Sequence, residues 1–107
     1  MDLFKKIKQN KKTFIIAEIS ANHKQKFANV IRLINHAVLA KVDAIKIQTY
    51  TPDTITLKTN KKDFRILDKK NNLYKKNLYD VFSEAYTPWK WQKKVFDYAK
   101  RKGLICF

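Results

Sequence analysis

The sequence predicts an α/β protein that begins like a β/α barrel, and three observations lead to that expectation. Apolar segments at 13–19 and 44–49 are typical of strands in a parallel sheet. Residues 26–40 between them have the three- and four-residue apolar spacing of an amphipathic helix. A third apolar segment at 104–107 follows two further helical patterns. This order corresponds to about the first two β/α units and the start of strand 3 of a (β/α)8 TIM barrel.

The first strand, over 13–19, is predicted to be buried. It is a nearly continuous apolar run with the β-forming residues Phe14, Ile15, Ile16 and Ile19. Such runs are expected where a parallel strand is covered on both faces. Residues 1–12 before it are lysine-rich and are expected to form an N-terminal arm, either loose or a short strand covering one end of the domain. Residues 13–107 are expected to be the incomplete barrel domain.

The helix over 26–40 and the strand over 44–49 complete a βαβ unit, and such crossovers are almost always right-handed. In the strand, Ile45 and Ile47 are expected to face one way, and Lys46 and Gln48 the other. The apolar stripe of the helix consists of Phe27, Val30, Ile31, Ile34, Ala37 and Val38.

The segment 51–76 is polar and is predicted to be a long irregular loop, which in a compact domain is often functional. A short helix is predicted over 77–86. A longer helix is predicted from Thr87, a capping residue followed by proline, to about Lys102. Gly103 is expected to terminate that helix before the third strand.

The composition suits one globular domain rather than a disordered chain, because 45% of the 107 residues are hydrophobic. The formal net charge of +15 first suggests a nucleic-acid partner. Only Arg32, Arg65 and Arg101 of the 24 basic residues are arginine, however, and the lysines are spread along the chain. Arginine is the residue favoured for base and phosphate recognition. Nucleic acid is therefore disfavoured as a partner, and a small lysine-rich nucleic-acid-binding module is kept as the alternative function.

The single cysteine, Cys106, leaves no internal disulfide and no zinc-ligand spacing. Its apolar neighbours predict a buried small residue rather than a nucleophile. No apolar segment approaches the ~20 residues of a membrane helix, and no secretory signal is visible. These features favour a cytoplasmic protein with no membrane partner.

The main candidate side chains lie near the carboxyl ends of the first two strands, and these ends meet at one rim of the sheet. Glu18 is a carboxylate in an apolar run, which is costly to bury unless it is paired or used. It is predicted to be catalytic; the alternatives are a surface position or an ion pair with Lys46. Lys46 and Gln48 offer a charge and an amide donor to an anion, unless they lie on the ordinary open face of an edge strand.

Loop residues near the same ends have weaker signals. Asn22 and Tyr50 are candidates for the rim of the site. His23 is a lone histidine in a loop, so it is expected to be a surface residue rather than a ligand, and no second histidine stands at metal-ligand spacing. Trp89 and Trp91 are expected to pack the last helix.

Several separated segments resemble the N-terminal part of the sialic acid synthase family, most closely its pseudaminic acid synthase branch. They cover nearly all of 13–107, in order and at matching spacing. The matching segments are IIAEISANH at 15–23, DAIKIQTYTPDTITL at 43–57, KKDF at 61–64 and LYDVFSEAYTPWKWQKKVFDYAKRKGLICF at 78–107.

The resemblance implies a transferase that condenses phosphoenolpyruvate with an open-chain N-acetylated aminosugar to give a nine-carbon nonulosonic acid. A divalent metal, Mn or Mg, is expected to polarise the sugar aldehyde. Glu18 matches the family glutamate thought to contact the sugar or assist the water step. Lys46 and Gln48 match the lysine and glutamine that hold phosphoenolpyruvate.

The resemblance also implies that this chain is an N-terminal fragment, inactive on its own. The metal ligands of the family belong to later strands, so they are expected outside this chain. The expected macromolecular partner is the remainder of the barrel or a homodimer partner.

Departures from the family pattern fall in the loops. Lys24, Gln25 and Lys26 replace a glycine-containing turn, Asn71-Asn72 replaces a glycine pair, and Gln92 replaces a histidine.

Overall fold

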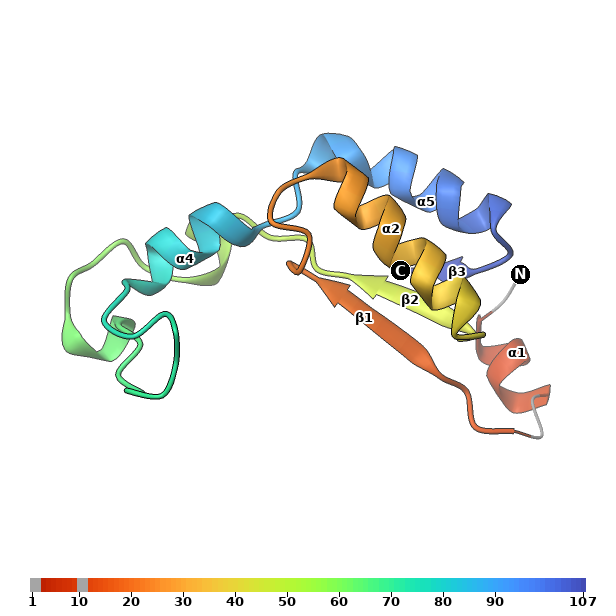
Figure 1. The fold of residues 1–107 in the computed structure, drawn as a ribbon, viewed down its shortest axis with the longest axis horizontal. Helices are drawn as coiled ribbons and strands as arrows, with labels where there is room; N and C mark the ends of the chain where they lie inside the picture. Colours follow the sequence, from red (N-terminus) through yellow and green to blue (C-terminus); the bar gives the residue numbers. More distant parts are fainter. Residues whose placement is uncertain (1–2, 10–11) are drawn as a thin grey trace.

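The computed structural model describes residues 3–9 and 12–107, and its centre is a three-stranded parallel sheet with two helices on one face (Figure 1). The strands lie in sequence order, so β1 pairs with β2 and β2 with β3. The predicted α/β fold with a small parallel sheet is thereby confirmed. The bounds are β1 Ile16–Ser20, α2 Phe27–Leu39, β2 Ala44–Ile47, α5 Gln92–Arg101 and β3 Ile105–Cys106.

The core lies between the sheet and the two helices α2 and α5. The predicted stripe of α2 is confirmed, since it supplies Val30, Ile34 and Ala37 to this core. Burying one such aliphatic side chain contributes roughly 1.5–3 kcal/mol to stability. The other buried members are Ile19, Ile45, Ile47, Val95, Ala99 and Leu104.

The opposite face of the sheet is open. Alternation along the strands places Ile16, Glu18 and Lys46 on it, and Ile16 is 44% exposed. The expectation that the first strand is covered on both faces is therefore wrong for this structure. The strand is apolar on both sides, but α2 and α5 cover only one of them (Figure 1).

The N-terminal segment forms helix α1, Leu3–Gln9, where a loose arm or a strand was expected. The parts of that prediction at 1–2 and 10–11 lie outside the described residues. Lys6 of α1 lines a hollow of about 430 Å³ together with β3 and α5, which places the helix beside the third strand. In the described ranges of the chain, no helix is long and apolar enough to span a membrane.

Residues 51–86 form a lobe that projects beyond the end of the sheet (Figure 1). The expected irregular loop contains two short helical turns, α3 (Pro52–Ile55) and a 3-10 turn (Lys62–Phe64). The helix predicted next is confirmed as α4, Leu78–Ala85. Asn77 caps α4, because its side-chain oxygen accepts a hydrogen bond from the backbone N–H of Tyr79 at 2.8 Å.

The last helix begins later than predicted. A 3-10 turn at Trp89–Trp91 comes first, and α5 starts at Gln92. Thr87 does not cap it, because its buried hydroxyl is hydrogen-bonded to His23 instead. The predicted stop is confirmed: Gly103 has a left-handed φ of +78°, which glycine adopts without a Cβ penalty.

Candidate functional site

Glu18 and Lys46 are direct neighbours on β1 and β2, and they form an ion pair on the open face of the sheet. The parallel register places their Cα atoms opposite each other. Lys46 Nζ donates to Glu18 Oε2 at 2.5 Å, and the two side chains are 43% and 40% exposed. The structure therefore brings together the carboxylate and the ammonium that the sequence singled out.

The backbone after Glu18 folds back onto its carboxylate. The pairing of β1 with β2 is irregular between Glu18 and Ser20, and Ser20 has a left-handed φ of +48°. This bend lets the Ser20 N–H donate to Glu18 Oε1 at 3.0 Å. Both carboxylate oxygens consequently have a donor, and an unusual backbone conformation stands beside the candidate site.

These contacts keep Glu18 ionised. Partial desolvation opposes ionisation, but the hydrogen bonds from Lys46 and Ser20 and the Lys46 charge outweigh it, so the pKa of Glu18 lies below its usual value. The pair offers a fixed carboxylate beside an ammonium. An incoming anion would have to compete with Glu18 for Lys46.

Among the described residues, no hydrogen bond joins the other three predicted site residues to this pair. Gln48 is exposed, one residue beyond the end of β2. Asn22 donates to the Ile19 carbonyl at 3.2 Å and lines a hollow against α2. Tyr50 is buried edge-to-face against Phe82 of α4, with ring centroids 5.5 Å apart, and burial raises the pKa of its hydroxyl.

His23 is fully buried, so the expectation of a surface histidine is wrong. Its Nδ1 accepts the Gln25 backbone N–H at 3.0 Å, which assigns the ring proton to Nε2. Nε2 then donates to Thr87 Oγ1 at 2.9 Å, and Thr87 donates to the Ser20 carbonyl at 3.4 Å. This chain of hydrogen bonds ties the end of β1 to the segment before α5. Burial lowers the pKa of His23, so the ring is neutral at pH 7.

The tryptophans divide between core and surface. Trp91 contacts the rings of His23 and Phe27 edge-on, at 5.5 and 5.6 Å between centroids. Trp89 is 58% exposed, so the expectation that it packs the last helix is wrong. Sequence reasoning missed the link between His23 and Thr87, because nothing local marks two residues 64 positions apart as partners.

The turn after His23 contains two consecutive left-handed residues, Lys24 and Gln25, each with φ +50°. Gln25 is held there by its side-chain amide, which donates to the carbonyls of Ser83 at 3.3 Å and Tyr86 at 3.0 Å. The turn is thus anchored to α4 and to the residue after it. Because the turn follows β1, these hydrogen bonds link the lobe to the strand that carries Glu18.

The residues described here do not fit a metal site. Among 3–9 and 12–107, no three His, Cys, Asp or Glu side chains are grouped so that they would hold a metal ion. Carboxylate, imidazole and thiolate groups are the usual protein ligands of such ions.

Comparison with known proteins identifies the family of this chain. The model of the NeuB family matches residues 33–107. The chain belongs to the NeuB family. It is similar to pseudaminic acid synthase of Campylobacter jejuni, with 46% identity over 99 residues and 92% of this chain covered. It is also similar to pseudaminic acid synthase of Helicobacter pylori, with 37% identity over 95 residues and 87% of this chain covered.

The match is confined to the N-terminal part of these relatives. This chain spans 28% of the Campylobacter jejuni protein and 27% of the Helicobacter pylori protein. The resemblance seen in the sequence is therefore confirmed at the level of the family and of the pseudaminic acid synthase relatives.

Proposed function

We propose that this chain is the N-terminal part of a nonulosonic acid synthase, a transferase that condenses phosphoenolpyruvate with an open-chain N-acetylated aminosugar. The observation that carries the proposal is the Glu18–Lys46 pair, which stands on neighbouring strands on the open face of the sheet. In a TIM barrel this face becomes the interior, with the active site at the strand ends. The sheet is proposed to supply the first three strands of such a barrel.

Each polar residue has a distinct role in this proposal. Lys46 supplies the positive charge that attracts phosphoenolpyruvate, and Gln48 supplies an amide N–H beside it. Glu18 is held ionised next to them, where it contacts the sugar or assists the attack of water. Asn22 and Tyr50 stay candidates for the rim.

The metal step is assigned to none of these residues. Mn or Mg is expected for the family, but the described side chains do not fit a site for it. We therefore place the ligands in a separate part of the enzyme. The remainder of the barrel, or a homodimer partner, is proposed to supply them, and the chain alone is proposed to be inactive. A cytoplasmic location belongs to the same proposal.

The first test is turnover by the purified chain with phosphoenolpyruvate, Mn²⁺ and a panel of N-acetylated aminosugars. We expect no release of inorganic phosphate. Clear turnover would contradict the proposed inactivity, while leaving the roles of Glu18 and Lys46 to the second test.

The second test supplies the rest of the enzyme. A chimera joins this chain to the part of the Campylobacter jejuni relative that lies beyond the match, and it is expected to release phosphate. Removing a charge that acts on the reacting groups typically costs about 100-fold or more in rate. Lys46→Met and Glu18→Gln should each show such a loss, whereas Lys94→Met, on the exposed side of α5, should retain the rate. A Lys46→Met chimera as fast as its parent would disprove the assignment.

The lysine-rich nucleic-acid-binding module considered from composition has no support in the comparisons.

A further inference from the structure

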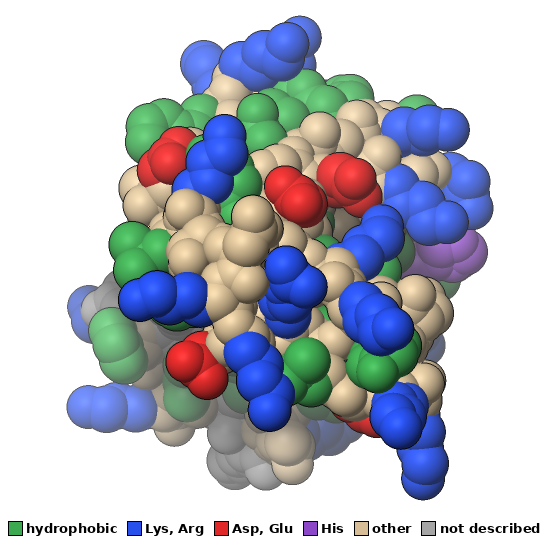
Figure 2. Space-filling view, turned by 90° about the vertical axis from the view of Figure 1, so that its left-hand side faces the viewer, with side chains coloured by type: hydrophobic (Ala, Val, Ile, Leu, Met, Phe, Trp, Pro, Cys, Tyr) green, Lys and Arg blue, Asp and Glu red, His purple; other side chains and the backbone are tan. Residues whose placement is uncertain are grey.

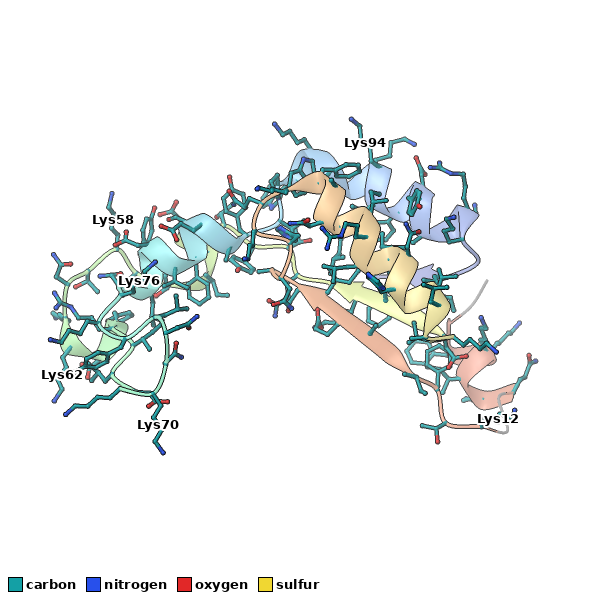
Figure 3. All side chains as sticks on the ribbon, viewed as in Figure 1. Lys12, Lys58, Lys62, Lys70, Lys76 and Lys94 are labelled. Atoms are coloured by element: carbon teal, nitrogen blue, oxygen red, sulfur yellow. The ribbon has the colours of Figure 1, made fainter. Side chains whose placement is uncertain are left out.

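The lobe carries a basic hollow that has no residue in common with the Glu18–Lys46 site. Two adjoining depressions, of about 530 and 430 Å³, share three lining residues: Asn60, Arg65 and Lys75. Together we call them the lobe hollow. Figure 3 shows Lys62 and Lys76, which line its two parts, on the lobe and far from the sheet.

Backbone pairing places the cations of the lobe hollow side by side. Arg65 and Asn77 form an isolated antiparallel bridge. The Ile66 N–H donates to the Lys76 carbonyl at 3.1 Å, and the Lys75 N–H donates to the Ile66 carbonyl at 2.8 Å. Arg65 and Lys75 therefore lie on adjoining segments of one small hairpin, and their proximity does not depend on chance side-chain rotation.

Asn77 joins this hairpin to the other wall of the lobe hollow. Its side-chain amide donates to the Thr59 carbonyl and to Asn60 Oδ1, while its oxygen caps α4. Because Asn60 uses its oxygen in that contact, its own amide N–H group is left to donate elsewhere. The walls are thus held by hydrogen bonds from three segments.

The charges in the lobe hollow are unbalanced. In one part Lys76 is paired with Glu84 at 3.7 Å, and Asp80 also lines it. The other part is lined by Lys62, Arg65 and Lys75 and by no acidic residue. Like charges held close together repel, and a bound anion relieves that repulsion.

The side chains that remain match a phosphate group with an organic body. Arginine offers a planar fork of N–H donors, lysine a point charge and asparagine a neutral N–H. Leu67 and Tyr74 form an apolar wall beside them. We propose that the lobe hollow binds a phosphorylated small molecule through its phosphate group, at a site separate from the proposed phosphoenolpyruvate site.

The distribution of charge favours a small ligand over a nucleic-acid strand. Figure 2 shows the lobe end-on, with Lys and Arg side chains scattered over the face and acidic ones between them, and no continuous basic stripe. A nucleic acid needs a track of charges along its backbone, whereas one phosphate group needs a single concave cluster.

The test is a titration of the whole chain with inorganic phosphate and pyrophosphate, followed by NMR of the side-chain amides of Asn60 and Asn77. Saturable shifts at these groups are expected, with pyrophosphate binding more tightly. The double variant Arg65→Gln/Lys75→Gln should weaken binding at least about tenfold, because it removes two charge-assisted contacts. The matched control Lys69→Gln/Lys70→Gln removes the same charge from exposed positions that do not line the hollow, and should stay within about twofold.

A second variant separates lost binding from lost folding. Lys75 has a left-handed φ of +68°, so Lys75→Gly removes a cation where glycine fits the backbone. It should fold at least as stably as the parent and still bind phosphate several-fold more weakly. If the control and Arg65→Gln/Lys75→Gln lose the same amount of phosphate affinity, the proposal is wrong. Binding would then depend on the overall positive charge of the chain rather than on the lobe hollow. Binding of a DNA oligonucleotide without saturable phosphate binding would overturn it as well.

Discussion

At the scale of single residues, the turn after His23 shows what backbone geometry demands of the sequence. Lys24 and Gln25 are both left-handed, in the place where the family resemblance leads us to expect glycine. A side chain in this conformation costs roughly 1–2 kcal/mol per residue. Gln25 offsets part of that cost with two side-chain hydrogen bonds to the lobe, whereas the exposed side chain of Lys24 makes no such hydrogen bond to the described residues.

Lys24→Gly is therefore expected to stabilise the chain. The free energy of unfolding should rise by about 0.5–1 kcal/mol, measured by urea denaturation followed by circular dichroism. The control Ala28→Gly, at an exposed position in the first turn of α2, should lower it by a similar amount. A destabilised Lys24→Gly variant would show that the lysine side chain, rather than the backbone, decides this turn.

His23 makes stability depend on pH. Its pKa in the folded chain lies below the unfolded value of about 6.5 because the ring is buried. The unfolded chain thus binds more protons between these two values, so stability is fully present above about pH 6.5 and falls as the pH drops below it. Ionised carboxylates with lowered pKa, such as Glu18, lose their contribution only further down, near their own unfolded pKa.

The measurement is the urea midpoint at pH 7.5 and at pH 5.5. The parent should lose stability between them. His23→Gln should be less stable than the parent at pH 7.5, because the contacts with Thr87 and Trp91 are altered. Its urea midpoint should then change little between pH 7.5 and pH 5.5. His36→Gln, at an exposed position on α2, should behave as the parent does. This account would be refuted if His36→Gln, rather than His23→Gln, removed the loss of stability between pH 7.5 and pH 5.5.

At the scale of elements, α2 is the piece that connects the strands to the second covering helix. It contacts β1 and α5, and Ile34 at its centre is fully buried between them. Tyr98 of α5 also donates to Asn35 of α2 at 2.8 Å. The βαβ unit and α5 are therefore expected to unfold together.

Ile34→Ala should lower the free energy of unfolding by about 2–5 kcal/mol, the usual cost of a cavity of this size in a packed core. Leu39→Ala, at the 76% exposed end of the same helix, should change it by less than about 0.5 kcal/mol. Urea denaturation measures both. Similar small effects in the two variants would mean that the core between α2 and the sheet is not tightly packed.

At the scale of the whole molecule, the sheet is a layer with one uncovered face and a free edge. The helices α2 and α5 cover one side of the sheet (Figure 1). Ile16 and Phe107 are 44% and 39% exposed. The backbone of Phe107 pairs with Ile45 and Ile47, which flank Lys46 in the chain. Free strand edges and exposed apolar surface favour association. An uncovered sheet face and a free strand edge are expected of a chain that spans 28% of the length of its Campylobacter jejuni relative. We propose that further strands complete this sheet.

The isolated chain should accordingly self-associate as its concentration rises, as measured by sedimentation velocity. Phe107→Lys should shift the distribution towards the monomer, because a charge next to the open sheet opposes pairing. The control Leu39→Lys, at an exposed helix position, should leave the distribution unchanged. A parent that stays monomeric at every concentration would contradict this view of the open face.

The sequence by itself determined the local elements and their order. The stripe on α2, the helix α4 and the stop at Gly103 follow from periodicity and backbone preference, which act within a few residues. It also placed Glu18 and Lys46 on neighbouring parallel strands near their carboxyl ends, which lie at the same end of the sheet. The family could be recognised for the same reason, since its motifs are short and in order.

Only the tertiary structure decided which side chains are buried and which neighbours they meet. Residues 64 positions apart, His23 and Thr87, pair inside the molecule, so a histidine expected at the surface lies in the core, and a threonine expected to cap a helix binds that histidine. The exposure of Ile16 on β1 was decided in the same way. Burial depends on which elements pack against a segment, and that information is distributed over the whole chain.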